Sequence, residues 1–298
     1  MKLPPEHPRR LAYLGSPELA IPPLEALVAA GHDVVMVVSR PDVRRGRRGQ
    51  PTPSPVKAAA LRLGLPVTDR VEDVLDVGAD LGVVVAFGRL IKPPVLERLA
   101  MVNLHFSLLP RWRGAAPVER AILAGDERTG VSLMALEETL DTGGVYRKTE
   151  LGIGNDETLD ELRSRLVTAG TGLLLEALRD GFGPPEPQQG EPTYAAKIEP
   201  AELQLDWARP AVELFRVVRL GRAWTTFRGR RLLVWRARLA EEAPAADAGP
   251  PGTLQGLRVS TGLDKLELVE VQPEGKGRQP AAAWLNGVRP HAGERLGS

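Results

Sequence analysis

The chain has 298 residues, of which 43% are hydrophobic and 26% are charged, and its net charge is +1. This length accommodates two domains with substantial cores, and the composition is that of ordinary globular proteins. The absence of cysteine excludes disulfides, thiol nucleophiles and thiolate metal sites, and it fits a reducing compartment. No apolar run approaches the roughly 20 residues that cross a bilayer, and residues 1–10 show no secretory pattern. We therefore expect a cytoplasmic protein without membrane association.

The N-terminal part of the chain alternates between strand and helix patterns. Residues 11–14 form a short apolar run that stops at Gly15, and Ser16 followed by Pro17 is typical of a helix start. Apolar residues then recur at helical spacing up to residue 31, and the β-branched run 34–38 indicates a strand buried on both faces. The alternation continues with helices over 55–63 and 94–99 and strands over 65–67, 81–87 and 101–106. Such alternation predicts a Rossmann-like, doubly wound and mainly parallel α/β sheet.

The rest of the chain has a different pattern. Residues 130–136 and 143–151 are strand-like and are expected to pair, and residues 157–178 form an amphipathic helix. Residues 181–200 carry five prolines and little periodicity, which is typical of a linker. A helix over 211–220 then precedes short strands at 225–227, 231–236, 256–260 and 266–271, which favour a small β-barrel. We expect a first, α/β domain over 1–185, a linker over 186–207 and a smaller β-barrel domain over 208–298.

A polar pattern marks the end of the strand at 101–106. Side chains alternate between the faces of a strand, so Asn103, His105 and, with continued extension, Ser107 point the same way. They lie at the carboxyl end, where open α/β sheets build their sites. An amide and an imidazole about 7 Å apart can act on one reacting atom. The structural alternative, a capped strand end with a satisfied histidine, is equally compatible with this pattern.

Asp141 is the third candidate, within a Leu-Asp-Thr-Gly-Gly stretch between two predicted strands. An aspartate in such a turn most often bonds only to its own backbone. Spacing by itself does not place Asp141 near His105. Other catalytic motifs are absent: there is no dinucleotide or P-loop glycine pattern, no Gly-x-Ser-x-Gly elbow and no metal-ligand spacing among the four histidines. We expect no metal.

Two segments are locally basic. Residues 206–238 contain nine arginines against two acidic residues. Residues 40–57 contain one anion, Asp42, and six cations, which are Arg40, Arg44, Arg45, Arg47, Arg48 and Lys57. Such segments either contact phosphates or are ordinary solvated faces, and charge alone favours the second interpretation.

Residues 103–117, N-L-H-F-S-L-L-P-R-W-R-G-A-A-P, and residues 140–143, L-D-T-G, resemble the signature of the formyltransferases that use 10-formyltetrahydrofolate. Within that family they are most similar to the enzymes that formylate initiator methionyl-tRNA. The resemblance continues at residues 14–20, 40–57, 83–91, 193–198 and 205–207, so it covers nearly the whole chain and is strongest up to residue 207.

The resemblance implies roles for the matching positions. Asn103, His105 and Asp141 correspond to the catalytic trio. The folate-binding positions are implied to be Ser107, Leu108, Leu109 and Pro110 together with Phe87, Gly88, Arg89, Leu90 and Ile91. The basic insertion is implied to enter the tRNA acceptor end, with Arg47 at the position of its key arginine. The resemblance also implies that the domain over 1–185 is the catalytic domain and that the domain over 208–298 is an OB-like barrel that contacts the tRNA as well. Implied substrates are initiator methionyl-tRNA and 10-formyltetrahydrofolate, with tetrahydrofolate as a product and no obligate protein partner.

Two alternatives stay open. A related formyltransferase can act on a small amine, such as an amino sugar on a nucleotide or a glycinamide ribonucleotide. The basic insertion and the R-W-R-G-A-A-P extension argue against it. A non-catalytic folate- or RNA-binding module is the second alternative, and the intact trio argues against that one.

Overall fold

The structure is a computed structural model that describes residues 2–44, 50–240 and 249–297. The chain divides into two compact units. The first comprises Met1–Val118, Arg128–Gly152 and Arg163–Ala196, and the second comprises Glu119–Glu127, Ile153–Leu162 and Lys197–Ser298. In the described parts of the chain, no helix is long and apolar enough to span a membrane.

The first unit is built on a seven-stranded sheet with the order β10-β9-β7-β6-β1-β2-β5. The five strands from β7 to β5 run parallel, whereas β9 and β10 are antiparallel to their neighbours. The predicted Rossmann-like sheet is thereby confirmed. The strands are β1 (Arg10–Gly15), β2 (Asp33–Val38), β5 (Val67–Thr68), β6 (Leu81–Val85), β7 (Met101–His105), β9 (Arg128–Ala135) and β10 (Val145–Gly152).

Helices cover both faces of this sheet because its central strands are apolar on both sides. All five residues of β6 are buried, as expected for a parallel strand inside an α/β fold. One face packs against η2 (Val71–Leu75) and α3 (Pro93–Leu96) in a common apolar cluster. On the other face, Gly170 of α5 (Leu159–Asp180) lies against β9 and β7, where a Cβ would come within 3.1 Å of Val131. The helices η1 (Glu18–Ala20), α1 (Ile21–Ala29) and α2 (Pro55–Arg62) follow β1 and β2 along the chain.

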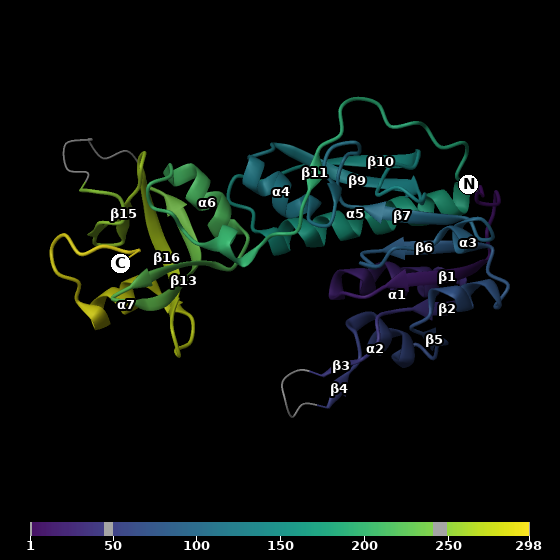
Figure 1. The fold of residues 1–298 in the computed structure, drawn as a ribbon, viewed down its shortest axis with the longest axis horizontal. Coiled ribbons are helices and arrows are strands. Elements are labelled where there is room, and N and C mark those ends of the chain that lie inside the picture. Colours follow the sequence, from purple (N-terminus) through teal and green to yellow (C-terminus); the bar gives the residue numbers. More distant parts are fainter. Residues whose placement is uncertain (1, 45–49, 241–248, 298) are drawn as a thin grey trace. The chain divides into compact units, whose positions relative to one another are not determined.

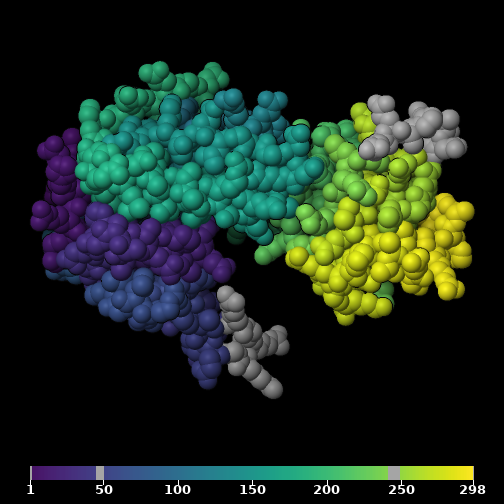
Figure 2. All heavy atoms as spheres, turned by 180° about the vertical axis from the view of Figure 1, so that it is seen from behind, coloured from purple at the N-terminus to yellow at the C-terminus, as the bar shows by residue number. Residues whose placement is uncertain are grey.

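Three short features complete this unit. The antiparallel pair β3 (Val43–Arg44) and β4 (Pro51–Thr52) extends away from the sheet (Figures 1 and 2). Between β7 and β9, the chain forms β8 (Arg113–Gly114), and α4 (Pro117–Ala124) begins at the end of this unit. The strand β11 (Tyr194–Ala195) pairs in parallel with β8 although it lies far along the chain. The expected linker therefore contains regular pairing.

The second unit is an antiparallel β domain around one core, which accords with the smaller β-rich domain expected here. It contains η3 (Pro200–Leu203), α6 (Ala211–Arg219) and α7 (Ala281–Val288). The strand expected over 256–260 is shorter, β15 (Arg258–Ser260), because Gly256 lies at a φ of 62° in the turn that joins it to a preceding strand, β14. The strands are β12 (Ala223–Phe227), β13 (Arg230–Leu239), β14 (Leu254–Gln255), β15 (Arg258–Ser260), β16 (Lys265–Pro273) and β17 (Gln279–Pro280).

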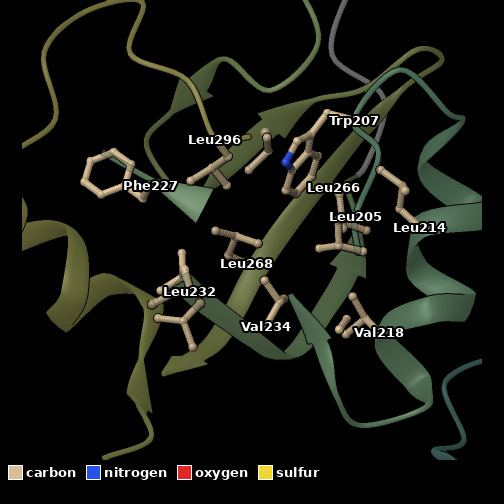
Figure 3. Packing of buried hydrophobic residues seen from close by; sticks show 14 of the residues in the cluster. Leu205, Trp207, Leu214, Val218, Phe227, Leu232, Val234, Leu266, Leu268 and Leu296 are labelled. Carbon is tan, nitrogen blue, oxygen red and sulfur yellow. The ribbon is translucent and has the colours of Figure 1, made fainter. Parts of the chain in front are cut away.

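The core of the second unit includes the buried side chain of Trp207 (Figure 3). Its indole lies beside Leu266 and Leu205, and its Nε1–H donates to the buried Thr225 Oγ1 at 2.9 Å. The only polar atom of this large side chain is therefore satisfied, so that the ring stabilises the unit through burial without an orphaned donor.

Candidate active site

The structure brings His105 and Asp141 together. β7 ends at His105, and its ring Nδ1 lies 3.6 Å from Asp141 Oδ2. The two side chains are only 6% and 10% exposed. Few water molecules can therefore screen the electrostatic contact between the ring and the carboxylate.

A main-chain carbonyl fixes which ring nitrogen carries the hydrogen. His105 Nε2 lies 2.8 Å from the carbonyl oxygen of Trp112. A carbonyl oxygen only accepts hydrogen bonds, so Nε2–H is the donor in this contact. In the neutral ring, Nδ1 is therefore the basic nitrogen, and it faces Asp141. Proton uptake by His105 at this position creates the imidazolium directly beside the carboxylate.

Asp141 is held by the turn that carries it. Its φ is 51°, in the left-handed region, and its Oδ2 accepts the Gly114 N–H at 2.8 Å. The turn also requires glycine at residue 143, where a Cβ would lie 2.0 Å from the Ala135 carbonyl oxygen. The carboxylate therefore bonds to the segment that carries Gly114. It does not bond only to the backbone of its own turn, as an aspartate in such a turn most often does.

Asn103 lies two residues before His105 on the same face of β7. Its backbone neighbours are Val84 of β6 and Met134 of β9, so it stands in the centre of the sheet. The side chain is partly exposed, and over residues 2–44, 50–240 and 249–297 its amide makes no hydrogen bond. An amide that is anchored on a central strand but lacks a protein partner is available to donate to a ligand.

The segment after β7 is a preformed loop. The Ser107 hydroxyl donates to the Arg111 carbonyl at 2.5 Å, and Ser132 bonds to the Ser107 carbonyl at 2.7 Å. Ser107 is fully buried and Leu109 nearly so, while Leu108 and Pro110 are partly exposed. The buried hydroxyl of Ser107 therefore stabilises the conformation of the loop through its hydrogen bond to the Arg111 carbonyl.

The segment 87–91 follows β6, the strand beside β7. Phe87 and Ile91 are buried in the apolar cluster of that face, whereas Leu90 is 73% exposed. The guanidinium of Arg89 lies 5.4 Å from the Phe87 ring and donates to the Asp69 carbonyl at 2.6 Å. Both segments expected to bind folate thus leave the carboxyl ends of adjacent strands, which is the usual site in such sheets.

The basic insertion is described only in part. Arg40 and Arg44 are exposed, and the Lys57 Nζ pairs with Asp42 at 2.7 Å. Arg45, Arg47 and Arg48 lie outside the described residues. In the second basic segment, Arg219 is buried and donates to the carbonyls of Glu157 and Gly154.

One nearby group has a strongly shifted pKa. Burial, with a smaller contribution from the charge of Glu137, raises the pKa of Tyr146 to about 12. Tyr146 lies on β10, just after the Asp141 turn, and its hydroxyl stays protonated through the neutral range. Among the described residues, no cluster of three or more histidine or acidic side chains is arranged to hold a metal ion.

Sequence reasoning missed a group of residues that surround the His105–Asp141 pair. Gln188 donates to the Asp141 and Gly143 carbonyls, and the Thr193 hydroxyl accepts the Trp112 N–H. The only sign of these residues in the sequence was the unusual length of the aperiodic stretch 181–200. Long loops without secondary structure often carry function.

Comparison with known proteins gives a consistent result. The formyl transferase family matches residues 9–178, and the formyl transferase C-terminal domain matches residues 197–289. A methionyl-tRNA formyltransferase of Methylococcus capsulatus is 42% identical over 97% of this chain and 100% of its own. Proteins of the same name from Paracoccus denitrificans and Heliobacterium modesticaldum are 43% and 40% identical, over 94% and 97% of this chain and 97% and 100% of their own.

Solved structures share the fold at lower identity. HypX from Aquifex aeolicus in complex with tetrahydrofolic acid superimposes with a TM-score of 0.67 at 18% identity, over 97% of this chain and 48% of that one. An N-formyltransferase from Helicobacter canadensis, in complex with folinic acid and dTDP-3-aminofucose, superimposes with a TM-score of 0.68 at 17% identity, over 88% of this chain and 98% of that one. At these identities the likeness concerns the fold alone.

Proposed function

The chain belongs to the formyl transferase family and, within it, to the methionyl-tRNA formyltransferases, and we propose that His105, Asp141 and Asn103 carry out its formyl transfer. The reaction moves the formyl group of 10-formyltetrahydrofolate to the amino group of initiator methionyl-tRNA. The observation that carries the assignment of the site is the buried contact between His105, at the end of β7, and Asp141, in the turn before β10.

The chemistry requires one bond to form, one to break and one proton to move. The amino nitrogen of the methionyl ester attacks the formyl carbon and gives a tetrahedral intermediate with an oxyanion. The bond from that carbon to N10 of the folate then breaks. The attacking nitrogen loses a proton and N10 gains one, so the reaction needs no net acid or base.

The His105–Asp141 pair is suited to carry this proton. Trp112 holds Nε2–H, so the ring accepts a proton at Nδ1, where the Asp141 carboxylate stabilises the resulting imidazolium. The same proton can be returned to the leaving N10. Because both side chains are buried, the pair avoids the screening that weakens such contacts in water.

Asn103 supplies the second function. Its unpartnered amide stands on the face of β7 that leads to His105, so an N–H can be aimed at the oxyanion. A donor of this kind contributes about 3 kcal/mol to lowering the barrier. The anchoring of the residue on a central strand means that little reorganisation is needed during the reaction.

We assign the remaining contacts by position. The loop at 107–110, with Ser107, Leu108, Leu109 and Pro110, and the loop at 87–91 flank the trio on adjacent strands and would hold the folate. The exposed Arg40 and Arg44 belong to the basic insertion that would meet the phosphates of the tRNA acceptor end. Since initiator tRNA is charged and used where translation occurs, we place the enzyme in the cytoplasm.

An acceptor comparison tests this function. Purified protein is given 10-formyltetrahydrofolate with initiator methionyl-tRNA, elongator methionyl-tRNA or a nucleotide amino sugar. The proposal expects efficient formylation of the initiator, much less of the elongator and none of the sugar. Preferred transfer to the sugar would overturn the assignment of the acceptor. The absence of transfer to any of the three would overturn the assignment of the reaction.

A further inference from the structure

The stretch from Glu186 to Ala195, here called the strap, bonds to the turn that carries Asp141 and to residues 112–114, which follow His105 along the chain. It is anchored at both ends by main-chain hydrogen bonds. Glu186 exchanges two bonds with Val145, at 2.8 and 2.9 Å, and β11 pairs with β8. All of these residues belong to the first unit. The strap is therefore an ordered part of the catalytic unit.

Within this strap, the side-chain amide of Gln188 forms hydrogen bonds through both its oxygen and its nitrogen. Its Oε1 accepts two hydrogen bonds from the Arg113 guanidinium, at 3.0 and 2.6 Å. Its Nε2 donates to the carbonyls of Asp141 and Gly143, at 2.8 and 2.9 Å. One side chain thus connects the turn that bears Asp141 to the residue that precedes Gly114, whose N–H binds the Asp141 carboxylate.

Thr193 holds the other partner of the histidine. Its Oγ1 accepts the Trp112 N–H at 2.9 Å, and its carbonyl accepts the Arg113 N–H at 2.8 Å. Trp112 is the residue whose carbonyl receives the His105 Nε2–H. The strap therefore fixes the peptide that determines the tautomer of the catalytic ring.

Backbone conformation gives an independent reason for this arrangement. Trp112 and Asp141 both adopt left-handed conformations, with φ of 63° and 51°. Such conformations cost about 1–3 kcal/mol in residues other than glycine and persist only where the surroundings enforce them. Both strained residues contact His105, and both are bound by the strap.

We propose that Gln188 and Thr193 are positioning residues that act through Asp141 and Trp112 to hold His105 in its reactive geometry. This inference deepens the proposed function and rests on it for the role of His105. Neither residue touches the reacting atoms. A displacement of about 1 Å in such a support can cost about 10²-fold in rate, so the strap contributes to turnover and not merely to folding.

The test uses near-isosteric variants that remove only the hydrogen bonds. Gln188→Met removes all four contacts of the amide, and Thr193→Val removes the acceptor for Trp112. Gln189→Met is the matched control, because Gln189 is the exposed neighbour in the same strap. We expect kcat to fall about 10- to 100-fold in Gln188→Met and Thr193→Val, with KM for both substrates little changed. Thr193→Ser, which keeps the hydroxyl, should recover most of the turnover.

A measurement without turnover separates this inference from the proposed function. The ring signals of His105 are identified by nuclear magnetic resonance through their loss in His105→Gln. They should shift in Gln188→Met and Thr193→Val and stay in place in Gln189→Met. Unchanged ring signals and wild-type kcat in both strap variants would overturn the inference. If the wild-type protein fails to formylate methionyl-tRNA, the proposed function fails, and the ring signals alone decide the positioning role.

Discussion

Replacing Asp141 by asparagine removes the charge beside the His105 ring while keeping an oxygen for the Gly114 N–H. At the observed 3.6 Å between His105 Nδ1 and Asp141 Oδ2, a unit charge pair is worth about 5 kcal/mol at an effective dielectric constant of about 20. A barrier increase of that size corresponds to about 10³-fold in rate. Asp141 Oδ2 both accepts the Gly114 N–H and faces His105 Nδ1. An amide oxygen at this position keeps the turn in place but carries no charge to stabilise the imidazolium, so we expect Asp141→Asn to lower kcat by about 10²- to 10³-fold.

Single-turnover formyl transfer with excess enzyme isolates the chemical step from substrate binding. Glu138→Gln is the matched control, because it removes a carboxylate from an exposed position just before the same turn. The control should transfer formyl at the wild-type rate. A rate for Asp141→Asn within about tenfold of wild type would refute the electrostatic reasoning, because the charge pair would then contribute under about 1.4 kcal/mol.

Three further predictions concern other parts of the chain. Asn103→Ala should lower kcat about 10²-fold with little change in folate affinity, measured by single-turnover kinetics and folate titration; a parallel loss of both would make Asn103 a binding residue. Raising the salt concentration should weaken tRNA binding, and Arg44→Ala should reduce the slope of log affinity against log salt by about one; an unchanged slope would remove Arg44 from the interface. A hydrogen bond from Arg228 lowers the pKa of Glu294 from 4.5 to about 2, so this pair stabilises the fold above pH 4.5 and loses its contribution as the pH falls towards 2. The difference in unfolding free energy between wild type and Glu294→Gln should shrink over that interval, and a constant difference would contradict the assigned pKa.

The sheet and half of the site followed from local patterns in the sequence. The buried run of β6 and the alternation of β7 were enough to predict a parallel core with Asn103 and His105 on one face. This worked because the period of a strand is set by the backbone, so each side chain has only two possible directions. For these strands, the spacing of apolar residues and the positions of turn residues were sufficient for the prediction.

The contact between His105 and Asp141 was beyond such reasoning. It depends on a turn in which Gly143 packs against Ala135 and in which Asp141 accepts the N–H of Gly114, 27 residues away in sequence. The resemblance to formyltransferases implied the trio, but it did not imply how the trio is held. Periodicity carries no information about which loops meet.

Two helices and the strap also escaped prediction. α4 and α7 are short, and their apolar residues do not distinguish a helix from a loop. The strap acts through an amide side chain, a hydroxyl and main-chain groups, so it has no apolar pattern to recognise. Its proline content was typical of a linker, whereas its main-chain bonds to Val145 and β8 and the side-chain bonds of Gln188 show that it belongs to the first unit.

Charge counts were similarly incomplete as indicators of a binding surface. The nine arginines of residues 206–238 include the buried Arg219, whose guanidinium donates hydrogen bonds to two main-chain carbonyls. Arg228 and Arg238 form ion pairs with Glu294 and Glu267. The net positive charge that this segment presents to a tRNA is therefore smaller than its composition indicates.

Transfer of a ¹³C-labelled formyl group tests the central claim most directly. The label is followed from 10-formyltetrahydrofolate to the α-amino nitrogen of initiator methionyl-tRNA, with wild-type protein and with His105→Ala at equal folate occupancy. We predict that the label reaches that nitrogen rapidly with wild type and slower by orders of magnitude with His105→Ala. Transfer at equal rates by the two proteins, or a label that stays on the folate in both, would contradict the account.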